Sequence, residues 1–470
     1  MCKDNQQQKN KSRQMDLFIH GGKPAAPERD GSPDRGETGV EWSSRLRQQQ
    51  SLTSDLLDRI ADPANLIRAY RQVARNGGSP GLDGMRIEEL KQWLNTNVNE
   101  LQRSLLQETY EVAPVRKVNI PKPGGGQRML GIPTVTDRLV QQAIHQKLSP
   151  VYEPYFSPSS FGFRPGRNAG QAIRQASQYV REGKVWAVDI DLKKFFDTIN
   201  HDRLMTHLSK AIADKRLLRL INGYLSSGMM EDGLAEQRTA GTPQGGPLSP
   251  LLSNIVLDEL DRELHKRGLS FCRYADDCNI FVGSRKAAHR VMRSLIRFIE
   301  TKMKLKVNRD KSGVRRCEQV TFLGYTVLSD GGIRVADRST NRLKDKVREI
   351  TKRNRGVPFN QLLDELNAVI RGWSNYFQLA NRWLSNLRDI DGWIRRKLRC
   401  YRLKQCGRKY TTYKFLRSFG VSKGKSWNVV MYSQGWWNMS SKVAVSHSMN
   451  LRWFARVGLH SLHQRINSKT

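Results

Sequence analysis

Two short apolar runs joined by acidic residues constrain the fold of this chain more than any other feature. Phe271–Ala275 and Cys278–Val282 have strand length, and the tetrapeptide Tyr274-Ala-Asp-Asp277 lies across their junction. Apolar runs separated by so few residues predict an antiparallel hairpin within a sheet. Its tip would present Asp276 and Asp277 to a cleft. Taken alone, the tetrapeptide is more simply explained as an Asp-rich turn.

A second acidic segment, Asp189 to Asp197, follows the strand-like Val185–Val188. Alternate side chains of a strand share a face, so Asp189 and Asp191 would point the same way. Carboxylates gathered from two strands suit Mg²⁺, which prefers oxygen ligands. Two such ions can activate a 3′-hydroxyl and stabilise a leaving pyrophosphate. Together, the two segments offer the kind of oxygen ligands that such a pair of ions needs.

Thr242–Pro250 is a glycine-rich loop that opens the predicted helix Leu251–Leu264. Glycine allows a backbone to approach a ligand closely, and a helix N-terminus favours anions. The loop is therefore a candidate nucleotide contact.

Positive charge dominates the chain, with 80 Lys and Arg against 44 Asp and Glu, a net charge of +36. After Asp391 there are 17 basic residues and no acidic residue. Basic side chains beside aromatic rings suit nucleic acid, because phosphates are neutralised while bases stack. The alternative is a solvated basic tail whose tryptophans belong to the core. The tryptophans in question are Trp393, Trp427, Trp436, Trp437 and Trp453.

The sequence gives no sign of a membrane span or an export signal. No apolar stretch approaches about 18 residues, and no apolar region follows the charged N-terminus. The six cysteines form no C-x-x-C pair, which argues against both a disulfide framework and a zinc site. We expect a cytoplasmic, nucleoid-associated protein without membrane contact.

Several ordered motifs resemble reverse transcriptases encoded by group II introns. They are Ile120–Pro133, Ser160–Arg167, the Asp191 segment, Pro243–Pro250, Tyr274–Asp277 and Phe322–Tyr325, followed by the maturase-like Phe359–Leu363 and Arg371–Phe377. The resemblance implies an RNA-directed DNA polymerase from a bacterium. Its substrates would be dNTPs, its cofactors two Mg²⁺ ions, and its partners group II intron RNA and a DNA target and primer. The oligomeric state stays open.

The resemblance assigns site residues position by position. The catalytic, metal-binding carboxylates would be Asp191, Asp276 and Asp277; Asp191 is chosen over Asp189 because it fits the family spacing D-x-x-x-x-F-D. Phe196 would be the steric gate against a ribose 2′-hydroxyl. The other nucleotide-binding residues would be Lys122, Arg128 and Gln244. For Lys122 and Arg128, a solvated basic hairpin is the alternative.

The implied fold is α+β: a right-hand polymerase with an antiparallel palm sheet, then a helical thumb. Residues 1–52 would be a flexible extension, 53–335 fingers and palm, 336–405 the maturase thumb, and 406–470 a basic DNA-binding segment. The Phe322–Tyr325 turn would lie near the primer or be a buried strand end, and Trp373, Tyr376 and Phe377 would pack the thumb core.

The resemblance leaves a choice of roles. Lacking paired C-x-x-C motifs, the chain is similar to family members without an H-N-H nuclease, which need a ready-made primer. It would splice its intron and copy it into DNA during retrohoming. Alternatives are a splicing cofactor with an unused polymerase site, or a reverse transcriptase recruited to phage defence or CRISPR adaptation. The intact carboxylate set favours an enzyme, and the maturase-like segment favours an intron.

Overall fold

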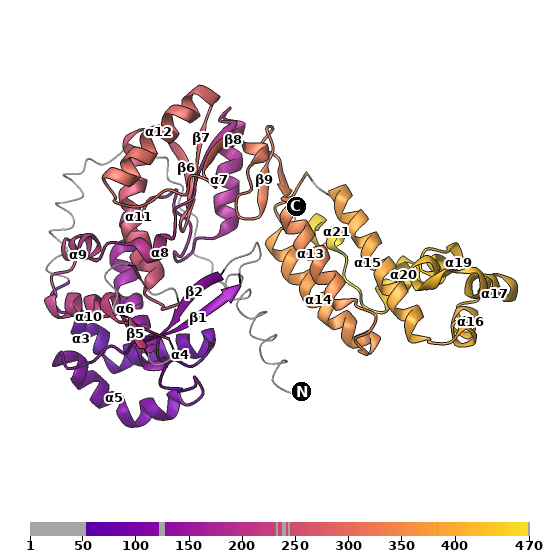
Figure 1. Cartoon of the computed structure of the whole chain (residues 1–470), viewed down its shortest axis with the longest axis horizontal. Helices are drawn as coiled ribbons and strands as arrows, with labels where there is room; N and C mark the ends of the chain where they lie inside the picture. Colours follow the sequence, from indigo (N-terminus) through magenta and orange to yellow (C-terminus); the bar gives the residue numbers. More distant parts are fainter. Residues whose placement is uncertain are drawn as a thin grey trace. The chain divides into compact units, whose positions relative to one another are not determined.

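A computed structural model describes residues 53–121, 127–231, 234–236, 241–242, 245–382 and 384–468. The chain divides into two compact units between Arg316 and Cys317. The N-terminal unit is described from residue 53 to 316, and the C-terminal unit from residue 317 to 468 (Figure 1). Within these residues, no helix combines the length and the apolarity needed to cross a membrane.

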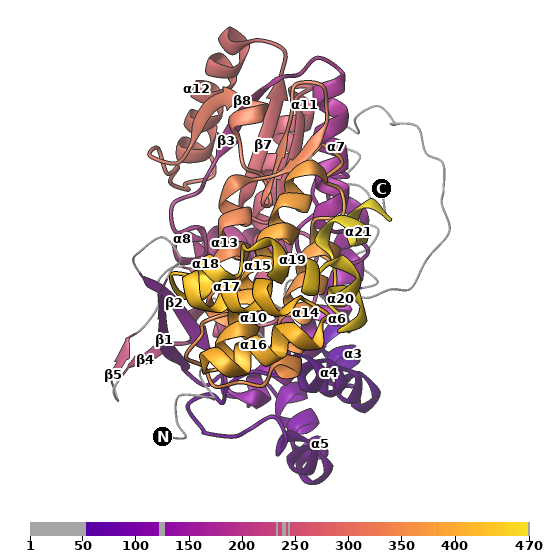
Figure 2. The same cartoon turned by 90° about the vertical axis from the view of Figure 1, so that its right-hand side faces the viewer.

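A four-stranded antiparallel sheet organises one end of the N-terminal unit (Figures 1 and 2). Its strand order is β6-β7-β3-β8, with bounds Ser270–Tyr274, Asp277–Val282, Trp186–Ile190 and Gly313–Arg316. Helices α7 (Ala169–Arg181), α11 (Ser249–Lys266) and α12 (Arg285–Thr301) contact it. Val188 and Ile190 of β3 are buried in the core, so the alternate residues of that strand point to the opposite face. The predicted hairpin is confirmed, and its strands belong to this sheet.

Helices and a second sheet complete the N-terminal unit. The sheet has the strand order β2-β1-β4-β5. Its strands are β1 (Val115–Pro121), β2 (Gln127–Ile132), β4 (Met229–Glu231) and β5 (Leu234–Glu236). The helices are α3 (Leu56–Ala61), α4 (Pro63–Asn76), α5 (Leu90–Leu106), α6 (Val135–Tyr152), η2 (Glu153–Tyr155), α8 (Phe195–Thr198), α9 (His201–Ser209) and α10 (Lys215–Ser226).

Local capping sets where two of these helices begin. Asp62 accepts a hydrogen bond from the Asn65 amide, and Pro63 occupies the first turn of α4, where its missing N–H costs nothing. Thr134 caps α6 in the same way through the Asp137 amide. Helix α6 lies deep in the unit, with Leu139, Ile144 and Leu148 fully buried.

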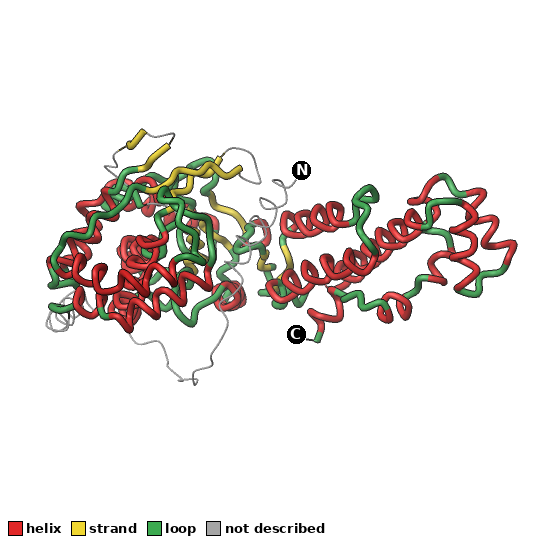
Figure 3. The backbone as a smooth tube through the Cα atoms, turned by 90° about the horizontal axis from the view of Figure 1, so that it is seen from below, coloured by secondary structure: helices red, strands yellow, loops and turns green. Residues whose placement is uncertain are grey.

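The C-terminal unit is almost entirely helical, as the red segments of Figure 3 show. Its short elements are η3 (Cys317–Gln319) and the antiparallel pair β9 (Tyr325–Val327) and β10 (Ile333–Val335). The longer helices are α13 (Asp337–Ile350), α14 (Phe359–Tyr376) and α15 (Leu384–Gln405). The remaining helices are α16 (Lys409–Ser418), α17 (Lys423–Tyr432), α18 (Gly435–Met439), α19 (Val443–Ser448), α20 (Leu451–Arg456) and α21 (Leu462–Asn467).

Helix α21 packs against α14 and α15. Leu462 and Ile466 are fully buried there. The Asp391 carboxylate on α15 accepts hydrogen bonds from the Leu462 amide at 3.0 Å, the His463 amide at 3.1 Å and the Ser461 hydroxyl at 2.6 Å. Asp391 therefore caps a helix about seventy residues further along the chain.

Candidate active site

The acidic residues of the two segments meet where β3 and β7 lie side by side. In the antiparallel register, Asp189 is opposite Asn279 and Ile190 is opposite Cys278. Asp191 and Asp277 are the residues next to this last pair. Neighbouring strands lie about 4.8 Å apart, so carboxylates from separate chain segments converge at one strand end. That these residues share one catalytic site stays a prediction.

Asp276 lies in the tight turn of the hairpin. Tyr274 pairs with Asp277, so Ala275 and Asp276 form a two-residue connection. Ala275 has φ 57°, a conformation that costs energy for any residue with a Cβ atom. The turn therefore needs support from its surroundings, and Asp276 is held at its tip.

The carboxylates repel one another electrostatically. Burial, followed by the negative charges of Asp276, Asp189 and Asp191, raises the pKa of Asp277 to about 7. Asp277 is itself exposed to solvent at the start of β7, so its carboxylate is open to an incoming ion or substrate. The Lys311 ammonium lies 3.6 Å from the Asp191 carboxylate and supplies part of the balancing charge.

Asp189 forms an ion pair with a residue of β8. The Arg315 guanidinium lies 3.2 Å from its carboxylate. Burial raises the pKa of Asp189, and Arg315 opposes that shift. This ion pair fits the sequence interpretation that Asp189 supports the strand.

An oxygen-only set of carboxylates with excess negative charge is chemically suited to a hard divalent cation. Among the residues that the structure describes, no three His, Cys, Asp or Glu side chains are grouped so that they could hold a metal ion. The assignment of Asp191, Asp276 and Asp277 as the residues that would hold Mg²⁺ stays a prediction.

The other predicted nucleotide contacts are described only in part. Phe196 on α8 is half-buried, and its ring makes an edge contact with Phe195 at 5.4 Å. Its carbonyl accepts a hydrogen bond from the Thr242 amide at 2.7 Å, at the start of the glycine-rich loop. Lys122 and Gln244 lie outside the described residues. Arg128 lies on β2, but its side chain is not among those described.

The glycine-rich loop lies close to β2. Gly245 has φ 138°, and a Cβ atom there would lie 2.6 Å from the Gly131 carbonyl oxygen. Only glycine avoids both this contact and the backbone strain. The loop therefore brings two of the sequence motifs together, Ile120–Pro133 and Pro243–Pro250.

A fully buried cation supports the hairpin turn, and sequence reasoning missed it. Arg273 on β6 donates to both carboxylate oxygens of Asp261 on α11, at 2.7 and 2.5 Å. Its third nitrogen donates to the Ala275 carbonyl at 3.0 Å and to the Asn254 side-chain oxygen at 2.9 Å. A charged residue inside an apolar strand was the available signal, because a buried charge needs a partner.

The network extends to another of the recognised motifs. The Asn254 amide donates to the Gly162 carbonyl at 2.9 Å. A Cβ atom on Gly162 would lie 2.2 Å from the Ala275 nitrogen, so the two backbones touch directly. The Ser160–Arg167 segment is therefore a support for the acidic turn, with Arg273 between them.

Aromatic side chains of the C-terminal unit form a packed cluster at the end of α14. Tyr325 is 1% exposed, and its ring contacts those of Tyr376 and Phe377 at 6.0 and 5.0 Å. The Tyr376 hydroxyl donates to the Leu323 carbonyl at 3.0 Å. Trp373 contacts Phe377 at 4.6 Å. These aromatics pack the core of their unit, as the helical spacing predicts.

The basic surface of the C-terminal unit combines cations with exposed rings. Trp427 and Trp437 are 46% and 37% exposed. The Arg396 guanidinium lies over the Trp437 ring at 4.0 Å, and the Lys397 ammonium lies between Trp393 and Trp437. The alternative in which all these tryptophans are core residues is wrong for Trp427 and Trp437.

Family comparisons agree with this geometry. The reverse transcriptase (RNA-dependent DNA polymerase) family model matches residues 120–327, and the group II intron maturase-specific domain matches residues 340–420. Protein YkfC of Escherichia coli is 33% identical over 314 residues, which cover 58% of this chain and 82% of YkfC. This chain belongs to the group II intron reverse transcriptase/maturase family. It carries an RNA-directed DNA polymerase domain, and Asp191, Phe196, Asp276 and Asp277 lie within it.

More distant relatives of this reverse transcriptase/maturase include group II intron-encoded protein LtrA of Lactococcus lactis. LtrA is 27% identical over 402 residues, covering 69% of this chain and 65% of LtrA. Among solved structures, a telomerase chain from Candida albicans is 14% identical with a TM-score of 0.39, covering 69% of this chain and 64% of the telomerase.

Proposed function

We propose that this reverse transcriptase binds its group II intron RNA as a splicing maturase. It then copies that RNA into DNA by target-primed reverse transcription during retrohoming. The matched polymerase and maturase domains support the two halves of this proposal. The similarity to LtrA, whose name describes a group II intron-encoded protein, supports the choice of RNA.

The observation that carries the polymerase mechanism is the register of β3 against β7, which ends with Ile190 opposite Cys278. Asp191 and Asp277 each adjoin this last pair, and Asp277 follows the turn that holds Asp276. These three carboxylates would hold two Mg²⁺ ions. Bound there, the ions would supply charge stabilisation for the attacking 3′-hydroxyl and the leaving pyrophosphate. The protein's own contribution is to hold the oxygens in place, through the strand register and through Arg273.

Selection of the nucleotide falls to the residues around this acidic face. The Phe196 ring would exclude a ribose 2′-hydroxyl and so favour dNTPs. Lys122 and Arg128 would neutralise the triphosphate, and Gln244 would border the incoming nucleotide. The contact between the Phe196 carbonyl and Thr242 supports a common role for α8 and the glycine-rich loop.

The proposed domains follow the polymerase plan. Residues 53–335 would form fingers and palm, 336–405 the maturase thumb, and 406–470 a basic segment that binds the DNA target. The exposed Trp427 and Trp437, in a stretch rich in Lys and Arg, support nucleic-acid binding by the C-terminal part of the chain.

The test compares two aspartates of the same segment. Asp191→Asn should lower primer extension on an RNA template by at least about a thousandfold, because a ligand charge is lost where chemistry occurs. Asp189→Asn is the matched control, since Asp189 is paired with Arg315, and it should keep activity within about tenfold. Equal loss in both variants, or full activity of Asp191→Asn, contradicts the assignment.

Splicing is measured on the same preparations with a precursor RNA containing the intron. Asp191→Asn should bind this RNA and promote splicing like the unaltered protein, because intron recognition does not use the metal site. A protein that promotes splicing but never extends a primer, even unaltered, would instead be a splicing cofactor with an unused polymerase site.

A further inference from the structure

A basic cavity lies on the N-terminal unit, formed by elements that carry none of the catalytic carboxylates. It has a volume of about 610 Å³ and lies between α3, α4 and α6. Its lining residues are Thr53, Arg59, Asn65, Arg68, Gln146, Lys147, Pro150 and Val151. In Figures 1 and 2, α3 and α4 lie at the opposite end of the unit from the β6-β7-β3-β8 sheet.

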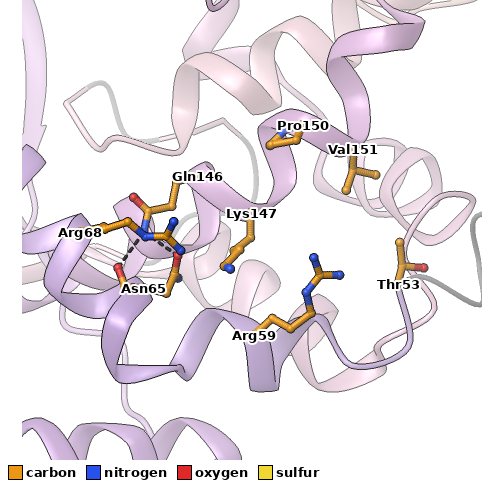
Figure 4. Close-up of a pocket in the computed structure, with 8 residues that line it drawn as sticks. All are labelled: Thr53, Arg59, Asn65, Arg68, Gln146, Lys147, Pro150 and Val151. Atoms are coloured by element: carbon orange, nitrogen blue, oxygen red, sulfur yellow. Dashed lines mark hydrogen bonds between the residues drawn. The ribbon is translucent and has the colours of Figure 1, made fainter.

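Three basic side chains from three different helices reach toward the same space. Figure 4 shows Arg59 from α3, Arg68 from α4 and Lys147 from α6 converging there. Within the part of the chain that the structure describes, neither Arg68 nor Lys147 forms an ion pair with a carboxylate. The pKa of Lys147 is lowered by burial and then by repulsion from Arg68 and Arg59, while Asp62 opposes the shift more weakly. The positive charge of Arg68 and Lys147 is therefore only partly neutralised.

The walls of the cavity are held in place by neutral amides. The Gln146 amide donates to the side chain and the backbone carbonyl of Asn65, at 2.6 and 2.7 Å. The Asn65 amide donates to the carbonyls of Ile60 and Ala143, at 2.8 and 3.2 Å. Asn65 is fully buried, so these bonds tie α4 to α3 and α6. The spacing between Arg68 and Lys147 is thus set by the scaffold before a ligand arrives.

We propose that this cavity binds a free polyphosphate ligand of nucleotide size, with its phosphoryl oxygens on Arg59, Arg68 and Lys147. Guanidinium and ammonium groups are the side chains that recognise phosphate. Small-molecule sites occupy about 300–1,000 Å³, and this cavity lies within that range. Pro150 and Val151 give it an apolar wall against which a base or ribose can pack.

A free ligand fits these features better than a nucleic-acid strand. A strand lying across the surface needs a track of cations, whereas these three converge on one recess with an apolar side. The site goes beyond the polymerase reaction, because its three basic residues come from α3, α4 and α6 rather than from β3 or β7.

Binding is measured by isothermal titration with ATP and with inorganic pyrophosphate, in EDTA so that no divalent metal supports binding at the acidic face. Lys147→Gln and Arg68→Gln should each weaken binding of both probes by about tenfold or more, since each removes a charged hydrogen bond. Arg71→Gln is the matched control, an exposed arginine on α4 outside the cavity lining, and it should change affinity by less than about threefold. Asp191→Asn should bind ATP like the unaltered protein.

Thermal melting shows that each variant is folded, and primer extension gives a second check for Lys147→Gln, Arg68→Gln and Arg71→Gln. Pyrophosphate should raise the melting temperature of the unaltered protein and of Arg71→Gln, but not of Lys147→Gln. The proposal is overturned if ATP and pyrophosphate bind all variants equally. It is also overturned if only the affinity for an RNA oligonucleotide falls in Lys147→Gln, which would make this surface a nucleic-acid interface.

Discussion

Arg273 and Asp261 form a bidentate ion pair in which neither side chain is exposed to solvent. The pair joins β6 to α11 directly behind the acidic turn, and Arg273 also holds the Ala275 carbonyl. Removing one partner leaves an uncompensated buried charge, whereas removing both does not. A comparison of the single and the double variant therefore distinguishes the effect of the ion pair on stability from its effect on the position of the turn.

Arg273→Met should lower the free energy of unfolding by about 3–5 kcal/mol, because Asp261 is left buried and unpaired. The double variant Arg273→Met/Asp261→Leu should recover most of that loss. It should still extend primers more slowly and need more Mg²⁺, because the Ala275 carbonyl no longer has its donor. Chemical denaturation and Mg²⁺ titrations of primer extension measure the two effects. Unaltered catalysis by the stable double variant would show that Arg273 has a structural role alone.

The steric-gate assignment can be tested by comparing variants of two neighbouring residues, Phe196 and Phe195. Phe196→Ala should increase incorporation of ribonucleotides relative to deoxynucleotides by roughly tenfold or more, since a pocket built to exclude a group loses its barrier. Phe195 is buried against the core, so Phe195→Leu should change melting temperature more than nucleotide choice. Single-nucleotide incorporation gives the ratio of kcat/KM values. An unchanged ratio in a folded Phe196→Ala protein would place the gate elsewhere.

Metal affinity should depend on pH near neutrality. The pKa of Asp277 is raised to about 7 by burial and by neighbouring carboxylates, so below that pH the carboxyl holds a proton and no longer offers a charged ligand. We expect Mn²⁺ affinity, measured by electron paramagnetic resonance, to fall about tenfold per pH unit as the pH drops below the pKa. Asp277→Asn should bind weakly with a shallower slope. If the Mn²⁺ affinity of the unaltered protein did not depend on pH, the raised pKa of Asp277 would be contradicted.

The raised pKa of Asp277 also predicts the direction in which the stability of the folded protein changes with pH. A carboxyl with a raised pKa favours the folded state in its protonated form, so this contribution is present at low pH and is lost as pH rises through about 7. Added Mg²⁺ should offset the loss at a pH above this value and have little effect well below it, which melting curves would show.

Charge on α16 and α17 should govern DNA affinity. Substituting four exposed lysines by glutamine should flatten the slope of log K against log salt by about 0.9 for each phosphate that is no longer neutralised. The residues are Lys409, Lys414, Lys423 and Lys425. A matched control substitutes four exposed lysines of the N-terminal unit, Lys91, Lys215, Lys266 and Lys286. An equal change of slope in both sets would mean that net charge, rather than this surface, binds DNA.

The hairpin that carries Asp276 and Asp277 was predictable because its signals, two short apolar runs, are local. The prediction that Asp189 and Asp191 share a face rests on strand periodicity alone. The support for that hairpin was not predictable in this way. Arg273 meets Asp261, Asn254 and, through Asn254, Gly162, which lie on other elements, and only the fold sets those distances.

The basic cavity was missed for a related reason. Arg59, Arg68 and Lys147 lie on three separate helices, and each alone is an ordinary surface cation. The role of Asp391 was not predictable from the sequence either. In the sequence it is only the last acidic residue before an acid-free segment, whereas in the structure it caps α21.

The Asp391 cap also has a consequence during synthesis of the protein on the ribosome. Its hydrogen-bond partners emerge about seventy residues after Asp391 itself. Until then, the apolar faces of α14 and α15 that receive Leu462 and Ile466 stay uncovered. The C-terminal unit can therefore complete its core only late in translation, so a premature stop between residues 391 and 462 would release a chain with exposed apolar surface that is prone to aggregation.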